Sequence, residues 1–349
     1  MHDGGRVQAT ELGGARALRE WITGQAREHS RVFLIESGAP TDDVAEVARR
    51  DDVVLLPAES GTYDGLGREV RYRGALRDAG DELFFGERGV ELQDYVAAAF
   101  VQIVGPTAVR FFDASSWQVF LDDAELARRT GVFPSALIDP RVLLADRSAL
   151  ENPGEMEAPR ALRVSADGSV GIGVQGRVIG TIDELSSVLA VPLPRAAALG
   201  GVAPGDALAA DLASREWIGR YLNATDLMKM LGLDNGTAKI SGFGWFPIDD
   251  DLSDAEPLTA EPFLLETPDG FVLADTRTLR RQLLTPSTAR VIAVIQTSSS
   301  TEIASERVAR LLGTSLSHAH ALCLEALTAL NVHVGRRGGY TDRVKGAER

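Results

Sequence analysis

The sequence predicts a multidomain protein of mixed α/β and α+β class that ends in a compact winged-helix module. Three observations predict this fold class. Strand-like and helix-like patterns alternate over residues 31–150, which is typical of an α/β domain. A β-hairpin pattern followed by helical patterns occupies the middle of the chain. The last quarter places three short strands before three helices, which is the element order of a compact winged helix.

Changes in composition along the chain predict the domain boundaries. Residues 151–159 combine turn-forming residues with acids, and residues 249–257 form a second acidic segment, so both are expected to connect domains. The predicted parts are a mixed α/β domain at 1–150, a β-hairpin and helical middle domain at 160–248, a winged-helix domain at 260–337 and a tail at 338–349.

Short apolar runs predict the strands of the first region, and apolar residues at helical spacing predict its helices. Strands are expected at residues 31–36, 53–56, 82–85 and 108–112. Helices are expected at residues 41–50, at 90–104 and after Ser115. This alternation favours an α/β domain.

A glycine-rich segment in the middle region has the spacing of a nucleotide-binding turn. Residues 171–176 match G-x-G-x-x-G, which in dinucleotide-binding folds opens a helix. The residues that follow, 177–182, are instead strand-like. We therefore expect these glycines to lie in a twisted β meander that begins with a hairpin at 162–172. Helices are expected over residues 203–232.

Composition limits the classes of protein to consider. The chain has 349 residues, of which 44% are hydrophobic and 25% charged, so it is long enough for two or three globular domains. Apolar runs of about 18 residues and an apolar signal core are both absent from the sequence, which predicts a cytoplasmic protein without a membrane span. The single cysteine, Cys323, excludes an internal disulfide.

Charge and motifs argue against several activities. The net charge is −14, and clustered Lys and Arg are what phosphate contact needs, so nucleic acid is a poor partner for most of the chain. His318 and His320 point to nearly opposite sides of a predicted helix and cannot chelate one ion there. The sequence contains no H-E-x-x-H, G-x-S-x-G or phosphate-loop motif. We predict no catalytic, cofactor or metal site, although an enzyme with an unrecognised site in residues 31–250 stays open.

Local signals define the elements of the C-terminal module. Pro-Asp-Gly between residues 263–267 and 271–274 predicts a hairpin, and residues 279–284 predict a third strand. Thr285 followed by Pro begins the first helix, and Gly313 ends the second, which starts near Ser300. The third helix begins near Leu316 and leads into an extended segment, Asn-Val-His-Val.

These same residues resemble the PqqD-like peptide-recognition domain, also called a RiPP recognition element. The resemblance is carried by Leu-Thr-Pro-Ser-Thr-Ala-Arg-Val-Ile at 284–292, by Glu-Ile-Ala at 302–304 with Val-Ala-Arg-Leu-Leu-Gly at 308–313, and by Glu-Ala-Leu-Thr-Ala-Leu-Asn-Val-His-Val at 325–334. Gln296-Thr297 stands where the family usually has an Asp-Gly turn, and Asn331 where a glycine is common. The similarity covers about 75 residues.

The resemblance implies that the protein binds the leader of a ribosomally synthesised precursor peptide. In such domains the leader adds as a strand to the third strand and lies in a groove against the third helix, which is β-augmentation. Arginines on the strand would meet acidic residues of the leader. Carried over by position, the peptide-binding residues are Leu279, Arg280, Arg281, Gln282, Leu283 and Leu284 on the strand, and Ala319, Leu322, Cys323 and Leu327 on the helix.

The layout of the whole chain is similar to that of the recognition proteins of daptide gene clusters. That similarity implies partner enzymes, namely a dehydrogenase, an aminotransferase and a methyltransferase. An unpaired third strand would serve self-association equally well, so an oligomer is a further expectation.

A winged helix-turn-helix transcriptional regulator is the main alternative, because two helices around a Gly turn also fit the last helices of the module. Its recognition helix would need side chains that reach bases. Residues 316–330 contain no Arg, Lys, Asn or Gln, which favours a peptide over DNA.

Overall fold

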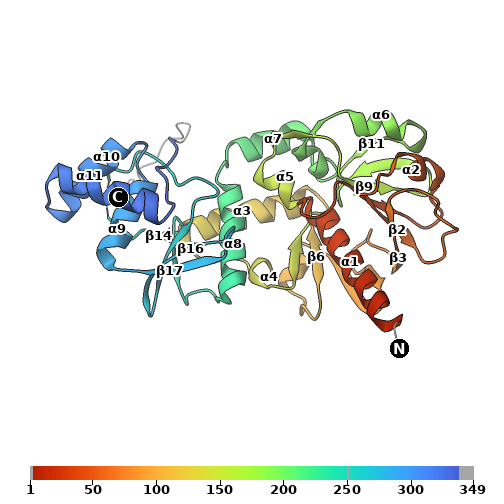
Figure 1. Cartoon of the computed structure of the whole chain (residues 1–349), viewed down its shortest axis with the longest axis horizontal. Coiled ribbons are helices and arrows are strands. Elements are labelled where there is room, and N and C mark those ends of the chain that lie inside the picture. The colour runs from red at the N-terminus through yellow and green to blue at the C-terminus, as the bar shows by residue number, and fades with distance from the viewer. Residues whose placement is uncertain (1–2, 250, 338–349) are drawn as a thin grey trace. The chain divides into compact units, whose positions relative to one another are not determined.

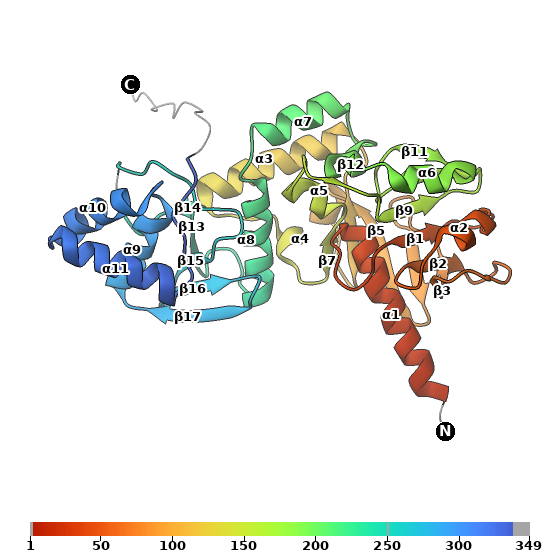
Figure 2. The ribbon, with the colours of Figure 1, turned by 45° about the horizontal axis from the view of Figure 1, so that its top comes forward.

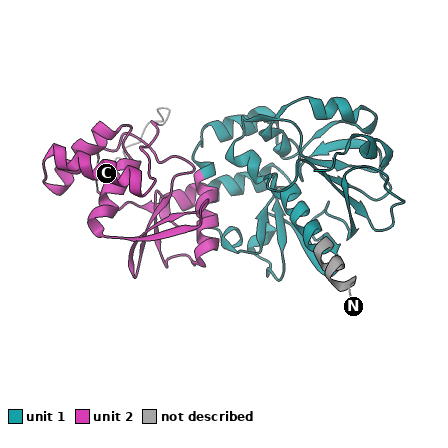
Figure 3. Ribbon diagram, viewed as in Figure 1, with its two compact units in different colours: residues 1–123, 134–219 teal, residues 124–133, 220–349 magenta. Residues whose placement is uncertain are grey.

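The computed structural model describes residues 3–249 and 251–337 of the chain, which form a mixed α and β protein (Figure 1). The chain divides into two compact units (Figure 3). Unit 1 comprises residues 1–123 and 134–219, and unit 2 comprises residues 124–133 and 220–349. Within the described ranges, none of the helices combines the length and apolar character of a membrane span.

A ten-stranded mixed sheet forms the body of unit 1. Its strands follow the order β11-β10-β9-β1-β2-β3-β4-β5-β6-β7. The runs β9-β1-β2-β3 and β5-β6-β7 are parallel, and the remaining pairs are antiparallel. The strands are β1 (Val32–Ile35), β2 (Val53–Pro57), β3 (Arg68–Gly74), β4 (Glu82–Phe85), β5 (Arg88–Asp94), β6 (Thr107–Arg110), β7 (Val142–Leu144), β9 (Ala161–Val164), β10 (Ser169–Ile172) and β11 (Val178–Thr181).

This sheet curls around the first helix, α1 (Asp3–Thr23), which Figure 2 shows against its strands. One face of α1, carrying Leu18, Trp21 and Ile22, is fully buried in a core that includes side chains of seven strands, β1 to β6 and β9. The Trp21 Nε1–H donates to the carbonyl oxygen of Leu162 at 2.8 Å. Because burying large apolar side chains is the main favourable term in folding, α1 is the centre of the unit 1 core.

Shorter elements complete unit 1. Helices α2 and α6 pack over the other face of the sheet, around Phe33, Ile35 and Val164. Helix α3 begins in unit 1 and ends in unit 2, and α8 lies mainly in unit 2. The elements are α2 (Asp42–Val47), η1 (Ala97–Ala99), α3 (Ala114–Thr130), α4 (Ser135–Ile138), α5 (Arg147–Glu151), β8 (Met156–Glu157), η2 (Ile182–Glu184), α6 (Leu185–Ala190), β12 (Leu193–Pro194), η3 (Arg195–Leu199), α7 (Gly205–Ala213) and α8 (Ile218–Leu231).

Unit 2 holds a five-stranded sheet in the order β14-β13-β15-β16-β17 and three consecutive helices. Helix α9 packs on β15 and β16, and α10 and α11 pack on α9. The elements are β13 (Lys239–Ser241), β14 (Gly244–Trp245), β15 (Phe263–Thr267), β16 (Gly270–Asp275), β17 (Arg280–Leu284), α9 (Pro286–Gln296), α10 (Thr301–Leu312) and α11 (Leu316–Ala329).

The local signals of the C-terminal module are confirmed. β15 and β16 form the expected hairpin, and β17 pairs with β16. The Thr285 hydroxyl accepts from the Thr288 N–H at the start of α9, with Pro286 as the first helical residue. Ser300 accepts from the Ile303 N–H, and Gly313 ends α10 with a left-handed φ of 62°. The side chains that cap these helices are therefore the ones that the sequence indicated.

Two of the helices predicted for the first region differ from the structure. The expected helix at 90–104 is wrong: residues 88–94 form strand β5, residues 97–99 a single 3-10 turn, and the rest is irregular. Val90 and Leu92 alternate with polar residues, which is the period of a strand. Helix α2 ends at Val47, before the expected Arg50, because Ala48 is already extended.

The hairpin of the middle region belongs to unit 1. β9 pairs with β1 in parallel register, so β9, β10 and β11 extend the sheet that the first region begins. The division into two units therefore does not follow the predicted boundary near residue 150, because pairing between distant strands overrides the break in composition. The predicted tail at 338–349 lies outside the described residues.

Candidate functional site

Strand β17 lies at an edge of the unit 2 sheet. Among residues 3–249 and 251–337 its only strand neighbour is β16, with Val272 opposite Leu283 and Asp275 opposite Arg280. In an antiparallel pair, every second residue directs its N–H and C=O away from the partner strand. β17 therefore presents a row of main-chain donors and acceptors on its outer side, to which another strand can pair.

The side chains of β17 are unusually exposed for an apolar and basic strand. Leu279, which precedes it in a left-handed conformation (φ 58°), is 67% exposed, and Leu283 is 71% exposed. Arg280, Arg281 and Gln282 are exposed as well. Native proteins usually protect such edges with charge, proline or a covering element. Arg280 and Arg281 supply charge here, but Leu279 and Leu283 add exposed apolar surface, which indicates a contact surface.

Alternation along β17 separates its two faces. Leu284 packs into the core formed with α9, α10 and α11, so Gln282 and Arg280 lie on the same face as the helices. Arg281 and Leu283 lie on the opposite face. A strand added to β17 would therefore meet a polar and basic row beside the helices, and an apolar and basic row on the other side.

The helix residues that the family resemblance indicated lie on α11 with different exposures. Ala319 and Cys323 are completely buried in the core cluster that also contains Leu327 and Leu284. Burial raises the pKa of the Cys323 thiol. Leu322 and Leu327 are half-buried. The structure thus brings the end of β17 and one face of α11 together. Of the four helix residues that the resemblance indicated, only Leu322 and Leu327 keep surface that a ligand can touch.

Four arginines surround the exposed strand without an acidic residue among them. Residues 277–290 contain Arg277, Arg280, Arg281 and Arg290, and no Asp or Glu. All four are exposed, and in the described part of the chain none of them forms an ion pair. Because the whole chain carries a net charge of −14, this segment is a local positive surface on an acidic protein.

The three histidines of the C-terminal region have different surroundings and do not form one site. His318 is exposed on α11, and His320 Nδ1 lies 3.1 Å from the Ser305 hydroxyl. The backbone N–H of His333 donates to the buried Glu261 carboxylate at 2.8 Å. The ring nitrogen Nδ1 of His333 lies 3.0 Å from the second oxygen of the same carboxylate. Over the described ranges, no group of three His, Cys, Asp or Glu side chains is arranged to hold a metal ion.

The glycine-rich segment of the middle region connects two strands, and the meander prediction is confirmed. β10 ends at Ile172 and β11 begins at Val178, with antiparallel pairing between them. A Cβ on Gly176 would lie 1.8 Å from the Ile172 carbonyl oxygen, and Gly173 has a φ of 67°. The tight connection between the strands therefore requires these glycines.

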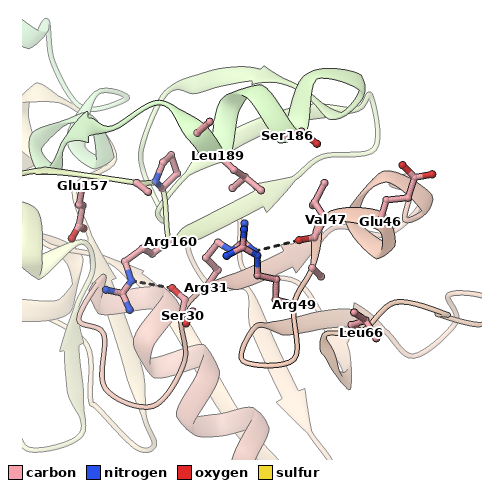
Figure 4. A pocket seen from close by; sticks show the side chains of 14 residues that line it. Ser30, Arg31, Glu46, Val47, Arg49, Leu66, Glu157, Arg160, Ser186 and Leu189 are labelled. Carbon is pink, nitrogen blue, oxygen red and sulfur yellow. Dashed lines mark hydrogen bonds between the residues drawn. The ribbon is translucent and has the colours of Figure 1, made fainter.

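A wide cavity of about 760 Å³ opens in unit 1 at the amino ends of β1 and β9 (Figure 4). Arg31 in this cavity pairs with Asp52, their Nη2 and Oδ2 atoms 2.6 Å apart. Arg160 donates to the backbone oxygens of Ser30 and His29. The guanidinium groups of these two arginines thus already have partners within the protein. Sequence reasoning missed this cavity, because its lining comes from segments that share no motif.

Comparisons with models of protein families, with curated proteins and with solved structures found no match for this chain. The assignment of a function therefore depends on the geometry of the chain and on the resemblance described above.

Proposed function

We propose that unit 2 binds the leader of a ribosomally synthesised precursor peptide by addition of a strand to β17. The observation that carries the proposal is the open edge of β17 with Leu279 and Leu283 exposed beside unpaired arginines. Main-chain hydrogen bonds would supply affinity, and alternate side chains of the peptide would supply specificity. The peptide would lie along β17 and reach Leu322 and Leu327 on α11.

Several further features belong to the same proposal. The three strands β15 to β17 followed by α9, α10 and α11 would constitute a winged-helix module of the PqqD-like kind. The protein would act without catalysis of its own, in the cytoplasm, and present the peptide to a dehydrogenase, an aminotransferase and a methyltransferase of the daptide type. The similarity of motif and layout supports this narrower assignment.

The exposed surface of α11 argues against DNA as the ligand. In a winged-helix regulator this helix would be the recognition helix, and it contains no Arg, Lys, Asn or Gln from Leu316 to Ala329. Its exposed residues include Leu316, Leu324 and Glu325. Base readout depends on the missing side chains, and the acidic Glu325 would repel phosphate.

The proposal can be tested by measuring the affinity of the full-length protein for a labelled precursor peptide from a neighbouring gene. Leu283→Asp places a negative charge on the exposed strand and should weaken binding at least tenfold. Val178→Asp is a matched control, because Val178 is 61% exposed on β11, an edge strand of the other sheet. This control should bind as the unchanged protein does.

Two results would contradict the proposal. One is equal affinity of the Leu283→Asp and Val178→Asp proteins for the peptide. The other is an absence of peptide binding together with a specific shift of a promoter fragment, which would favour a transcriptional regulator.

A further inference from the structure

The parallel strands of unit 1 converge at their carboxyl ends on a cluster of charged side chains. Arg163 lies on β9, Glu36 directly follows β1, and Arg110 is the last residue of β6. β1, β6 and β9 run in the same direction, since two antiparallel steps separate β3 from β5. Because the sheet curls, residues from strands far apart in the sheet order meet at this end. Ligands of α/β folds bind outside the carboxyl ends of parallel strands.

Two guanidinium groups lie next to each other in this cluster. The Arg163 Nη2–H donates to the Leu76 carbonyl oxygen at 2.8 Å, and the Arg110 Nη1–H donates to the adjacent Arg77 carbonyl oxygen at 3.2 Å. The Arg163 guanidinium lies over the Trp21 ring and the Arg110 guanidinium over the Phe112 ring. Both groups are therefore held in fixed orientations on one loop.

Both arginines also have carboxylates near them. Arg163 pairs with Glu36 at 3.4 Å. Asp146, Asp78 and Asp94 act electrostatically on Arg110, which forms no ion pair in the described part of the chain. The nearby Asp146 is 1% exposed and accepts from the N–H groups of Val174 and Gln175. Burial raises the pKa of Asp146 to about 7, so its charge is only partly developed near neutral pH.

Three buried N–H donors in this cluster lack a partner among the described residues. They are Arg110 Nε, Arg163 Nε and Gln175 Nε2. The Gln175 side chain is fixed, because its Oε1 accepts from the Phe111 N–H at 2.8 Å, which leaves only its amide nitrogen free. Buried polar groups nearly always have partners, so three unpartnered donors from three segments indicate a missing acceptor.

We propose that Arg110, Arg163 and Gln175 bind a small oxyanion, a carboxylate or a phosphate group, at the carboxyl ends of the parallel strands. The planar fork of arginine suits both groups, which accept two parallel hydrogen bonds. Arg77, whose side chain is 68% exposed, lies 3.7 Å from Glu36, so the cluster borders the surface on that side. This site is distinct from the cavity of Figure 4, which lies at the amino ends of the strands, and it does not depend on peptide binding.

The test is calorimetric titration of the full-length protein with inorganic phosphate and, separately, with acetate, at constant ionic strength. Arg110→Met keeps the apolar stem over Phe112 and removes the charge and the donors. Arg88→Met is the control, because Arg88 is exposed on β5. We expect saturable binding of at least one anion, weakened at least tenfold in Arg110→Met and unchanged in the control. The anion that binds more tightly identifies the ligand group.

Saturable binding of neither anion to the unchanged protein would overturn the proposal, as would equal binding by Arg110→Met. Should Arg110→Met fail to fold, Arg110→Lys retains the charge without the planar fork. It should bind the preferred anion more weakly by severalfold, and affinity equal to that of the unchanged protein would again reject the site.

Discussion

Unit 1 curls ten strands around helix α1, whereas unit 2 stacks α9 against a five-stranded sheet and leaves β17 at its edge. Both sheets end in an exposed strand with a large apolar side chain, Val178 on β11 and Leu283 on β17. Around β17, however, four exposed arginines that form no ion pair in the described part of the chain accompany the leucines. Both units have an exposed edge strand. The combination of apolar and basic side chains distinguishes β17, the edge for which we propose peptide binding.

The two units also place their arginines differently. In unit 1, Arg163 and Arg110 lie at the carboxyl ends of parallel strands, where backbone carbonyl oxygens and aromatic rings fix their guanidinium groups. In unit 2, the arginines around β17 are exposed. Exposed arginines contribute little to stability, whereas buried ones are costly unless they are paired. The first arrangement therefore suits a small enclosed anion, and the second suits an extended partner.

The largest expected effect comes from removing the centre of the unit 1 core. Trp21→Ala deletes a completely buried ring and its hydrogen bond to Leu162, and should lower the free energy of unfolding by about 3–5 kcal/mol. Denaturant unfolding followed by fluorescence and circular dichroism should then show a separate, earlier transition for unit 1. Phe246→Ala, at a position 54% exposed in unit 2, is the control and should change stability by less than about 0.5 kcal/mol. A single transition, shifted as a whole, would show that the two units unfold together.

The next largest expected effect is a dependence of stability on pH that arises in unit 1. The folded-state pKa of Asp146, about 7, lies above the ordinary value of about 3.9, so the folded protein holds a proton there that the unfolded chain has lost. Stability should therefore fall as pH rises from about 4 to about 7, by up to about 1.4 kcal/mol per pH unit. Urea unfolding at pH 5 and pH 8 should show this loss in the unchanged protein and much less of it in Asp146→Asn.

Asp64→Asn, at an exposed position, is the control for this measurement, and its stability should keep the full pH dependence. Identical pH profiles for Asp146→Asn and the unchanged protein would mean that Asp146 is ionised in the folded state across this range. Arg110 and Arg163, whose charges lower the pKa of Asp146, would then dominate over burial.

The smallest expected effect is confined to unit 2. Ser300→Ala removes the hydroxyl that accepts from the Ile303 N–H at the start of α10, and should cost about 1 kcal/mol. Thermal unfolding should show the change in the unit 2 transition alone. Ser317→Ala, at an exposed position within α11, should leave that transition where it is.

Where local chemistry decides a structure, the sequence was sufficient. The turn between β15 and β16 and the caps at Thr285, Ser300 and Gly313 each depend on two to four adjacent residues. Helix α1 shows the opposite case, because it was not predicted. It contains Gly14, where a Cβ would come within 2.7 Å of Val70 and 2.8 Å of Phe85, so the glycine that disfavours the helix locally permits its packing.

The candidate sites also differ in whether the sequence alone could locate them. The exposed strand 279–284 could be found in the sequence, but Ala319 and Cys323 could not be assigned to a groove or to a core, since both environments favour small apolar side chains. The anion cluster had no sequence signal. Phe111 and Gln175 are 64 residues apart and meet only because the sheet curls.

The position of α1 inside the sheet also has a consequence for synthesis of the chain on the ribosome. Trp21 bonds to Leu162, 141 residues later, so the first helix emerges long before its last partner strand. At typical translation rates of about 5–20 residues per second, that interval lasts roughly 7–28 s. During this time the sheet that buries the apolar face of α1 is incomplete. That face therefore stays exposed on the nascent chain, where chaperones can bind it.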